Sequence, residues 1–437
     1  MVAGRSKVAS GAERNTVTGI GNLAAEPLYF ERPAVGDSAV AAATAVWSID
    51  QIANQLAFGY WGGVKHAWDL SAGGRSIWFD VSALTNSGRN LARAALDLWS
   101  DVTGIRFVEI SGSSIGIKFD DASDGAFTTT DFSFGRIQSA NINIGTDWIS
   151  GTSGNLNSYA FQTYIHEIGH ALGLGHAGNY NETATYSAGA MYLNDGWPTT
   201  IMSYFDQWDN TYFRSQSFTF NYTMTPQLAD IAAMARLYDA PTGTRSGDTV
   251  YGFNSTAGRT VFDATKYAAG SYTIIDSGGI DTLDYSGFSA NQLIDLRAGN
   301  FSNVGANIGN VAIAVDTVIE NAVGGSGGDR IVGNEVANRL DGGAGDDVLE
   351  GSVGNDILLG GAGADFLSGG AGADELLGGD GQDVFVDLVA NLNGDTIDDF
   401  TPLDAILFTD ADFASFQFSF ADNVLNSPAD RWCLLDW

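Results

Sequence analysis

The spacing of apolar residues predicts helices and strands mixed together in the first half of the chain. Ser48, followed three residues later by Gln51, predicts the start of a helix through a capping box. Apolar residues that return every three or four positions predict further helices, at 90–102, 161–174 and 227–237. Alternation of apolar and polar residues predicts short strands, at 76–81, 105–110, 114–119 and 141–144. This mixture indicates an α/β or α+β domain.

The periodicity changes after a predicted linker at 240–244, where glycine repeats begin. Seven nine-residue units start at Gly324, Gly333, Gly342, Gly351, Gly360, Gly369 and Gly378. Their sixth positions are Asp329, Asn338, Asp347, Asp356, Asp365, Asp374 and Asp383. Each unit reads as a glycine turn followed by a short strand with one large apolar residue pointing inward. Stacked units of this kind predict an all-β domain, a parallel β-roll.

Composition limits the classes of protein that this chain can be. Its 437 residues are too many for one core, and 44% hydrophobic residues suffice for packed domains. A net charge of −32 argues against nucleic acid or an anionic membrane as a partner. The chain has no run of eighteen apolar residues, so we expect no membrane span. Cys433 is the only cysteine, which excludes an intramolecular disulfide.

Three of the four histidines lie within residues 166–176. His166 and His170 are four positions apart, so on a helix both rings project from one face. Gly173 lies where the helix should end, because glycine adopts left-handed backbone at little cost, and that turn can return His176 as a third ligand. Three neutral imidazoles around zinc with one open position form a catalytic arrangement. Glu167 can reach a water on the metal without being a ligand.

Chance is the alternative explanation for this histidine motif. A short His-Glu-x-x-His match occurs by chance in unrelated helices. The longer motif fixes five positions in a chain that has only four histidines, which makes a chance match improbable. We therefore predict a catalytic metal site with His166, His170 and His176 as ligands and Glu167 as the base.

The repeated carboxylates predict a second kind of metal site. Hard oxygen donors at close, regular spacing suit Ca²⁺. A flexible glycine linker is the alternative, but a linker would not keep aspartate at six of seven sixth positions in strict register. The predicted calcium ligands within the repeats are Asp329, Gly342, Gly345, Asp347, Asp356, Gly360, Gly363, Asp365, Asp374 and Asp383. Without calcium these turns repel one another, so we expect folding to require the ion.

Together the two motifs resemble the serralysin family, the secreted bacterial zinc proteases of the metzincin group. Residues 166–176 match the zinc signature of that family, and 201–204 match its Met-turn. Further similar blocks lie at 98–102, 237–238, 247–252 and 319–322. The resemblance implies an α/β (α+β) metzincin catalytic domain, expected at 46–242, followed by an all-β parallel β-roll and C-terminal domain at 243–437. Residues 1–45 are expected to form a loosely ordered leader.

The resemblance also implies roles for individual residues. Met202 would form a hydrophobic floor beneath the zinc, and Tyr204 would be a reversible zinc ligand that stabilises the oxyanion. The family usually has a proline after the third histidine, where this chain has Ala177. The family also binds calcium where its two domains join. The matching positions here are Arg245, Gly247, Thr249, Asp276, Gly278, Gly279, Asp281 and Glu320.

A secreted, zinc-dependent endopeptidase is the function that the resemblance implies. It would carry one catalytic zinc and several structural calcium ions, leave a bacterial cell without a signal peptide, and act as a monomer on protein and peptide substrates. A proteinaceous inhibitor is a further expected partner. The alternative is a calcium-dependent secreted binding or adhesion protein whose metzincin domain is inactive. Glu167 favours the enzyme, because an inactive site has no need of a base beside three intact ligands.

Overall fold

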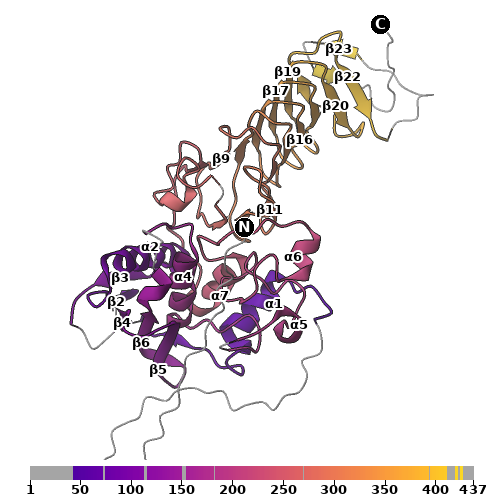
Figure 1. Ribbon diagram of the computed structural model, residues 1–437. Helices are drawn as coiled ribbons and strands as arrows, with labels where there is room; N and C mark the ends of the chain where they lie inside the picture. Colours follow the sequence, from indigo (N-terminus) through magenta and orange to yellow (C-terminus); the bar gives the residue numbers. More distant parts are fainter. Residues whose placement is uncertain are drawn as a thin grey trace, which may run out of the picture. The chain divides into compact units, whose positions relative to one another are not determined.

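The computed structural model (Figure 1) describes most of the chain. The described residues are 43–410 without 72–73, 113–115, 150–153, 182, 269 and 393, together with the backbone of 419–421 and 424–426. Nearly all of the expected leader at 1–45, and Cys433, lie outside them. The chain divides into two compact units, Met1–Thr244 and Arg245–Trp437.

The first unit contains a six-stranded, mainly parallel sheet. Its strands are β1 (Ala67–Trp68), β2 (Ser76–Asp80), β3 (Arg106–Glu109), β4 (Gly116–Asp120), β5 (Ala126–Ser133) and β6 (Arg136–Ile144). They lie in the order β1-β6-β4-β2-β3, and β5 pairs with β6 in the antiparallel direction. β6 begins earlier than the predicted strand at 141–144, because its first half is hydrogen-bonded to β5 even where apolar alternation is weak.

Helices account for most of the remaining core of the first unit. They are α1 (Ile49–Asn54), the π-turn η1 (Gln55–Gly59), α2 (Asn86–Thr103), α3 (Thr146–Ile149), α4 (Tyr159–Ala171), α5 (Tyr186–Gly189), α6 (Thr211–Ser215) and α7 (Leu228–Tyr238). The capping box of Ser48 and Gln51 is present at α1. α2 begins before the predicted position 90 because the Thr85 side chain caps it, and it ends at Gly104 with φ 65°.

Packing of α2 against α4 fixes the helix that carries two of the predicted ligands. Trp99 is completely buried, and its Nε1 donates to the carbonyl oxygen of Ile165 at 3.0 Å. This hydrogen bond from the polar edge of a large buried ring fixes the position of one helix along the other. Among the described residues, no helix is both long enough and apolar enough to cross a membrane.

The second unit is built mainly from short parallel strands, as predicted, and they form two main sheets (Figure 1). The nine-stranded sheet contains β7 (Val250–Gly252), β9 (Thr282–Asp284), β13 (Asn321–Val323), β15 (Arg339–Ala344), β17 (Ile357–Ala362), β19 (Glu375–Asp380), β21 (Thr396–Ile397), β24 (Val424–Asn426) and β23 (Ser419–Ala421). The β21–β24 and β24–β23 pairs of this larger sheet are antiparallel. The six-stranded sheet contains β10 (Leu293–Asp295), β14 (Arg330–Val332), β16 (Val348–Glu350), β18 (Phe366–Ser368), β20 (Val384–Asp387) and β22 (Ala405–Phe408). A smaller sheet and a 3-10 turn complete the unit: β8 (Tyr272–Ile274), β11 (Phe301–Ser302), β12 (Val311–Ile313) and η2 (Thr260–Phe262).

Alternate repeats belong to the same sheet, so one coil of the roll takes two repeats. Leu340, Leu358 and Leu376 are partners across the nine-stranded sheet, and Leu349, Leu367 and Phe385 across the other. All six side chains are completely buried. The inward apolar residue expected of each repeat therefore forms the core between the sheets.

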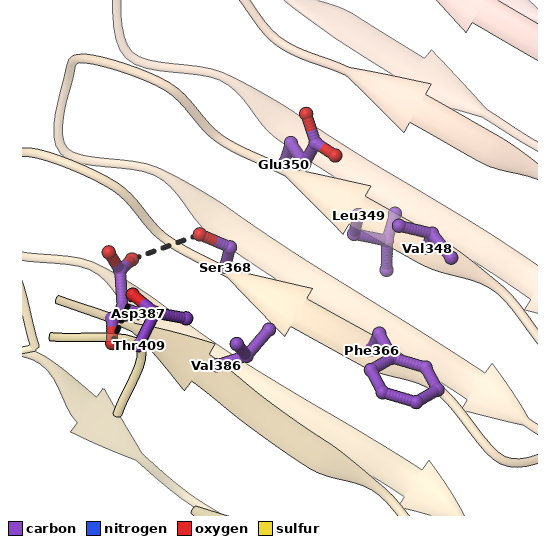
Figure 2. A pocket seen from close by; sticks show the side chains of 8 residues that line it. All are labelled: Val348, Leu349, Glu350, Phe366, Ser368, Val386, Asp387 and Thr409. Carbon is purple, nitrogen blue, oxygen red and sulfur yellow. Dashed lines mark hydrogen bonds between the residues drawn. The ribbon is translucent and has the colours of Figure 1, made fainter. Parts of the chain in front are cut away.

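The outer face of the six-stranded sheet carries a shallow pocket (Figure 2). Val348, Phe366 and Val386 line it, and Ser368 donates a hydrogen bond of 3.0 Å to the Asp387 carboxylate at its rim. The pocket contains none of the residues predicted to bind a metal or to act in catalysis.

Candidate metal centre

α4 and the turn after it bring the three predicted histidines together. Ser158 caps the helix, so His166 and His170 follow on one face of regular α-helix. Gly173 has φ 105°, and a Cβ there would lie 2.1 Å from the carbonyl oxygen of His66. Only glycine fits this turn, which returns His176. Its Nε2 lies 3.0 Å from that of His170, which lies 3.1 Å from that of His166.

The histidines are held in the form that binds a metal. His166 Nδ1 lies 2.8 Å from the carbonyl oxygen of Ile201, and His170 Nδ1 lies 2.8 Å from that of Leu174. A carbonyl only accepts, so each Nδ1 carries the proton and each Nε2 keeps its lone pair. Burial lowers the pKa of His166 to about 4 and that of His170 to about 3, and it holds the pKa of His176 well below the ordinary value. All three imidazoles are neutral at pH 7.

This donor set fits a zinc ion. Three neutral imidazole nitrogens converge from one helix and the turn that follows it, and all the ligand nitrogens lie within 4.8 Å of one another. Zinc accepts three such nitrogens and leaves one tetrahedral position for another ligand. Structural zinc sites instead fill all four positions with tightly held side chains.

Glu167 lies next to the first histidine and is almost completely buried. Its Oε2 lies 2.7 Å from the hydroxyl oxygen of Thr128 on β5. Burial raises the pKa of Glu167 to about 7, while the hydrogen bond from Thr128 acts in the opposite direction. A carboxyl group in such surroundings suits proton transfer near neutral pH. Sequence reasoning did not identify Thr128, because it is 39 positions away from Glu167.

The predicted Met-turn packs directly against the helix of the metal centre. Met202 is completely buried, and a Cβ on Gly169 would lie 2.7 Å from its sulfur, so glycine at 169 permits the contact. The backbone N–H of Ala177 donates to the Met202 carbonyl oxygen at 3.3 Å. Proline, which the family resemblance leads one to expect at 177, has no N–H and cannot make this bond. The departure at 177 therefore adds a link between the third histidine and the Met-turn.

Asp230 anchors the Met-turn and was missed in the sequence. It is completely buried at the start of α7. Its carboxylate accepts hydrogen bonds from the Thr200 hydroxyl at 2.6 Å, the Ile201 N–H at 2.8 Å and the Gln227 N–H at 2.8 Å. Because Ile201 also accepts from His166, Asp230 supports a ligand through one intervening residue. The only sign of Asp230 in the sequence is an acidic residue in the first turn of an otherwise apolar helix.

Tyr204 lies beside the three histidines. Its ring centroid is 4.7 Å from that of His176 and 6.1 Å from that of His166. Behind it lies Tyr180, with a centroid distance of 4.9 Å. Tyr180 donates to Asp195 at 2.9 Å, and that carboxylate also accepts from Ser203 at 2.7 Å. Asp195 is another buried acid that sequence reasoning missed. It holds Tyr180, whose ring packs against Tyr204, and Ser203, which precedes Tyr204 in the chain.

A carboxylate cluster in the second unit gathers the other residues expected to bind calcium. Asp281 Oδ1 accepts from the Thr249 N–H at 2.7 Å, and Glu320 accepts from the Asp281 N–H at 2.8 Å. Asp276 accepts from the Gly278 N–H at 2.9 Å. Asp281 is completely buried, and its Oδ2 has no hydrogen-bond donor among the described residues. Burial, with the charges of Asp276 and Glu320, raises the pKa of Asp281 to about 7. An orphaned buried oxygen among acids fits a cation.

Two rows of carboxylates run along the roll, one on each side. Within each row, Oδ1 of every member after the first accepts from the backbone N–H of the member before it. One row comprises Asp329, Asp347, Asp365, Asp383 and Asp404, and the other Asn338, Asp356, Asp374 and Asp395. Sequence reasoning missed Asp395 and Asp404, because both lie 21 positions from the preceding member of their row, whereas row members within the nine-residue repeats lie 18 apart.

Six of these carboxylates have a second oxygen without a hydrogen-bond partner among the described residues, whereas the Asp329 Oδ2 accepts from the Gly325 N–H and the Asp404 Oδ2 from the Thr401 N–H, both at 2.6 Å. Among the described residues, Oδ2 has no hydrogen-bond partner in Asp347, Asp356, Asp365, Asp374, Asp383 and Asp395. A Cβ on Gly342 would lie 2.4 Å from the Asp347 Oδ2 and 2.7 Å from the Gly360 carbonyl oxygen. Burial raises the pKa of Asp347 to about 7 and that of Asp365 to about 6. Unpaired oxygens beside glycine carbonyls are donors that suit calcium.

Comparison with known proteins agrees with both units. A family model described as Matrixin matches residues 80–188, and one described as Peptidase M10 serralysin C terminal matches residues 240–430. Serralysin from Proteus mirabilis is 41% identical over 271 residues, which are 56% of this chain and 53% of that protein. Metallopeptidase AprA from Pseudomonas marginalis is 41% identical over 257 residues, 56% of this chain and 54% of that protein. The chain spans about half the length of the curated relatives it matches.

Similarity to solved structures is much weaker. A hatching-enzyme zinc protease from Oryzias latipes, the medaka fish, matches with a TM-score of 0.26 and 16% identity, covering 40% of this chain and 95% of that one. A score this low supports no conclusion about the present chain.

Proposed function

The chain belongs to the serralysin family, and from that premise we propose that it is a secreted zinc-dependent endopeptidase. The observation that carries the proposal is the placement of Glu167 beside three converging, neutral histidine nitrogens. A carboxyl group next to a three-imidazole site supplies the base that hydrolysis of a peptide bond needs.

In this proposal His166, His170 and His176 would hold the zinc ion, and Tyr204 would be an additional, reversible ligand. When bound, zinc lowers the pKa of a water toward neutrality and polarises the scissile carbonyl. Glu167 takes a proton from the attacking water and then passes it to the leaving amine. The Tyr204 hydroxyl would donate its hydrogen to the oxygen on which negative charge develops.

We further propose that the carboxylates of the second unit bind several calcium ions. The unpaired Oδ2 atoms of the two rows and of Asp281 support this assignment. Bound cations would remove the repulsion between buried acids and so stabilise the roll. The same proposal includes Arg245, Gly247, Gly279, Gly345 and Gly363, which would bind calcium through main-chain groups.

The proposal also covers the substrates and other partners of the protein and the place where it acts. Protein and peptide substrates follow from the reaction itself. Secretion from a bacterium without a signal peptide, a monomeric state and a proteinaceous inhibitor stay predictions from the family. A calcium-dependent adhesion protein is not favoured, because Glu167 and all three histidines are in place for catalysis.

Replacing Glu167 by glutamine tests the proposed function. Gln keeps the size of the side chain but cannot accept the proton, so Glu167→Gln should lower the kcat for casein hydrolysis by about 100-fold or more. Zinc content, measured by mass spectrometry of the metal, should remain at one ion per chain. Glu109→Gln is the matched control, since Glu109 is exposed and pairs with Arg93 on the surface. Undiminished cleavage by the Glu167 variant would contradict the proposal.

A further inference from the structure

We propose that Thr128 is a positioning residue for the reaction, whose hydroxyl holds the Glu167 carboxylate in the orientation that receives the proton from water. This inference rests on the proposed function, because it concerns the base of that reaction. It adds a residue from β5, far from the zinc motif in sequence, to the groups on which catalysis depends.

The contact between the two side chains is short and specific. Thr128 Oγ1 lies 2.7 Å from Glu167 Oε2 and 2.9 Å from the main-chain carbonyl oxygen of the same residue. Both oxygens accept from the Thr128 hydroxyl, which has a single hydrogen, and the shorter of the two contacts is the one to Oε2. A hydrogen bond to a charged acceptor is about twice as strong as one between neutral groups. The hydroxyl thus contacts both the side chain and the backbone of one helical residue.

Holding Oε2 decides which oxygen does the chemistry. A glutamate side chain has three rotatable bonds, and its last torsion is broad, so burial alone does not select one orientation of the carboxylate plane. With Oε2 hydrogen-bonded to Thr128, Oε1 is the oxygen left to accept the proton. When Oε1 takes the proton, Oε2 becomes the carbonyl oxygen of the acid and still accepts from Thr128. The same hydrogen bond therefore orients Glu167 while it acts as base and while it acts as acid.

The surrounding structure keeps the threonine hydroxyl in place. β5 is hydrogen-bonded to β6 over its full length, and Thr128 stands opposite Ile142. β5 also packs against α4, which carries Glu167. A β-branched side chain is stiff about χ1, which limits the positions that the hydroxyl can take. Valine has the same shape and suits a strand equally well, so strand formation does not by itself call for a hydroxyl at 128.

Steady-state kinetics of two substitutions test this role. Thr128→Val removes the hydroxyl and keeps the shape, so kcat for a peptide substrate should fall about tenfold, a fraction of the full effect of a general base. KM, zinc content and thermal midpoint should stay close to those of the wild type. Thr128→Ser keeps the hydroxyl and should restore kcat to within about threefold of the wild type. Thr129→Val, on the opposite face of the same strand, is the matched control and should leave kcat unchanged.

Two kinetic results would overturn the inference. One is a Thr128→Val enzyme with the kcat of the wild type. The other is a Thr128→Ser enzyme as slow as the valine variant, which would assign the loss to packing. A rise in KM without a fall in kcat would also count against it, because that pattern reports substrate binding and not the proton transfer.

Crystal structures supply a readout that does not depend on activity. In the wild type the Glu167 carboxylate should occupy one position, within hydrogen-bond distance of Thr128. In Thr128→Val it should be displaced or divided between two positions. An unchanged single position in the variant would overturn the inference. If the zinc- and calcium-loaded wild type fails to cleave casein, the proposed function fails, while these structures still test whether Thr128 orients Glu167.

Discussion

The two units prepare their metal sites in opposite ways. In the first, three neutral imidazoles converge, and the Nδ1 atoms of His166 and His170 are hydrogen-bonded to backbone carbonyls. In the second, acids such as Asp347 and Asp365 are buried with one oxygen each left unpaired. The first site needs no ion to balance its charge. The second contains rows of buried acids whose charge bound cations would compensate.

Under the proposed assignment, this difference would separate a metal that acts in catalysis from metals that support the fold. Helix packing, the left-handed turn at Gly173 and the anchoring of Ile201 by Asp230 position the histidines through contacts within the protein. The roll has short strands and a thin core, so unpaired carboxylates weigh heavily against its folding. Removing zinc should therefore abolish activity and leave the first unit folded, whereas removing calcium should unfold the second.

Calcium removal should give the largest effect. Dialysis of the full chain into calcium-free buffer that contains zinc should unfold the region after about residue 245, because the carboxylates of the two rows then repel one another. Hydrogen exchange followed by mass spectrometry should show loss of protection in β13–β20 and retained protection in α2 and α4. Restoring calcium should reverse the change. If neither the hydrogen-exchange protection nor the circular dichroism spectrum responded to calcium, the claim that the second unit needs calcium to fold would be contradicted.

Replacing Tyr204 by phenylalanine should give an intermediate effect. Tyr204→Phe keeps the ring beside His176 and removes the hydroxyl proposed to stabilise the oxyanion, so kcat should fall about 100-fold. Zinc affinity should change much less, since the three histidines remain. Tyr186→Phe serves as control, because the Tyr186 hydroxyl donates to the Leu193 carbonyl oxygen. Parallel losses of zinc and of kcat would instead assign Tyr204 a structural role.

Replacing Asp195 by asparagine should give the smallest effect. Asp195 is a single buried acid outside the carboxylate rows of the second unit, so it shows how one buried acid alone makes stability depend on pH. Burial raises its pKa to about 7 from an ordinary value of 3.8. A raised folded-state pKa means that its contribution to stability is present below about pH 4 and is lost as the pH rises through 7. Asn does not titrate, and its carbonyl can still accept from Tyr180 and Ser203.

The measurement is the free energy of unfolding of Asp195→Asn relative to wild type, with zinc and calcium present. The difference should move in favour of the variant by about 1–2 kcal/mol between pH 5.5 and pH 8. Asp131→Asn, on the exposed part of β5, is a control that should show no such trend. A difference that does not depend on pH would show that Asp195 is ionised throughout this range.

Local spacing was enough to predict the elements that depend on near neighbours. The capping box of Ser48, the left-handed turn at Gly173 and the placement of His166, His170 and His176 all involve residues within a few turns of one another. The nine-residue glycine period likewise predicted parallel strands with one buried apolar residue each. The start of β6 was placed too late, because its pairing with β5 extends beyond the apolar alternation.

Contacts between distant segments were not predictable in the same way. Thr128 meets Glu167 because β5 packs against α4, and Asp230 meets Ile201 because α7 lies beneath the Met-turn. Neither pairing leaves a mark in local periodicity. Asp395 and Asp404 join the carboxylate rows only because a longer connection still returns each strand to its sheet.

The sequence by itself therefore predicted which ion each unit is suited to hold, since that depends on ligand type and short spacing. The tertiary structure alone decided how the ligands are supported. It placed a hydroxyl on the base, an acid behind the Met-turn and alternate repeats in separate sheets. The physical reason is that ligand chemistry is carried by single residues, whereas hydrogen bonds between segments depend on where packing brings the chain back on itself.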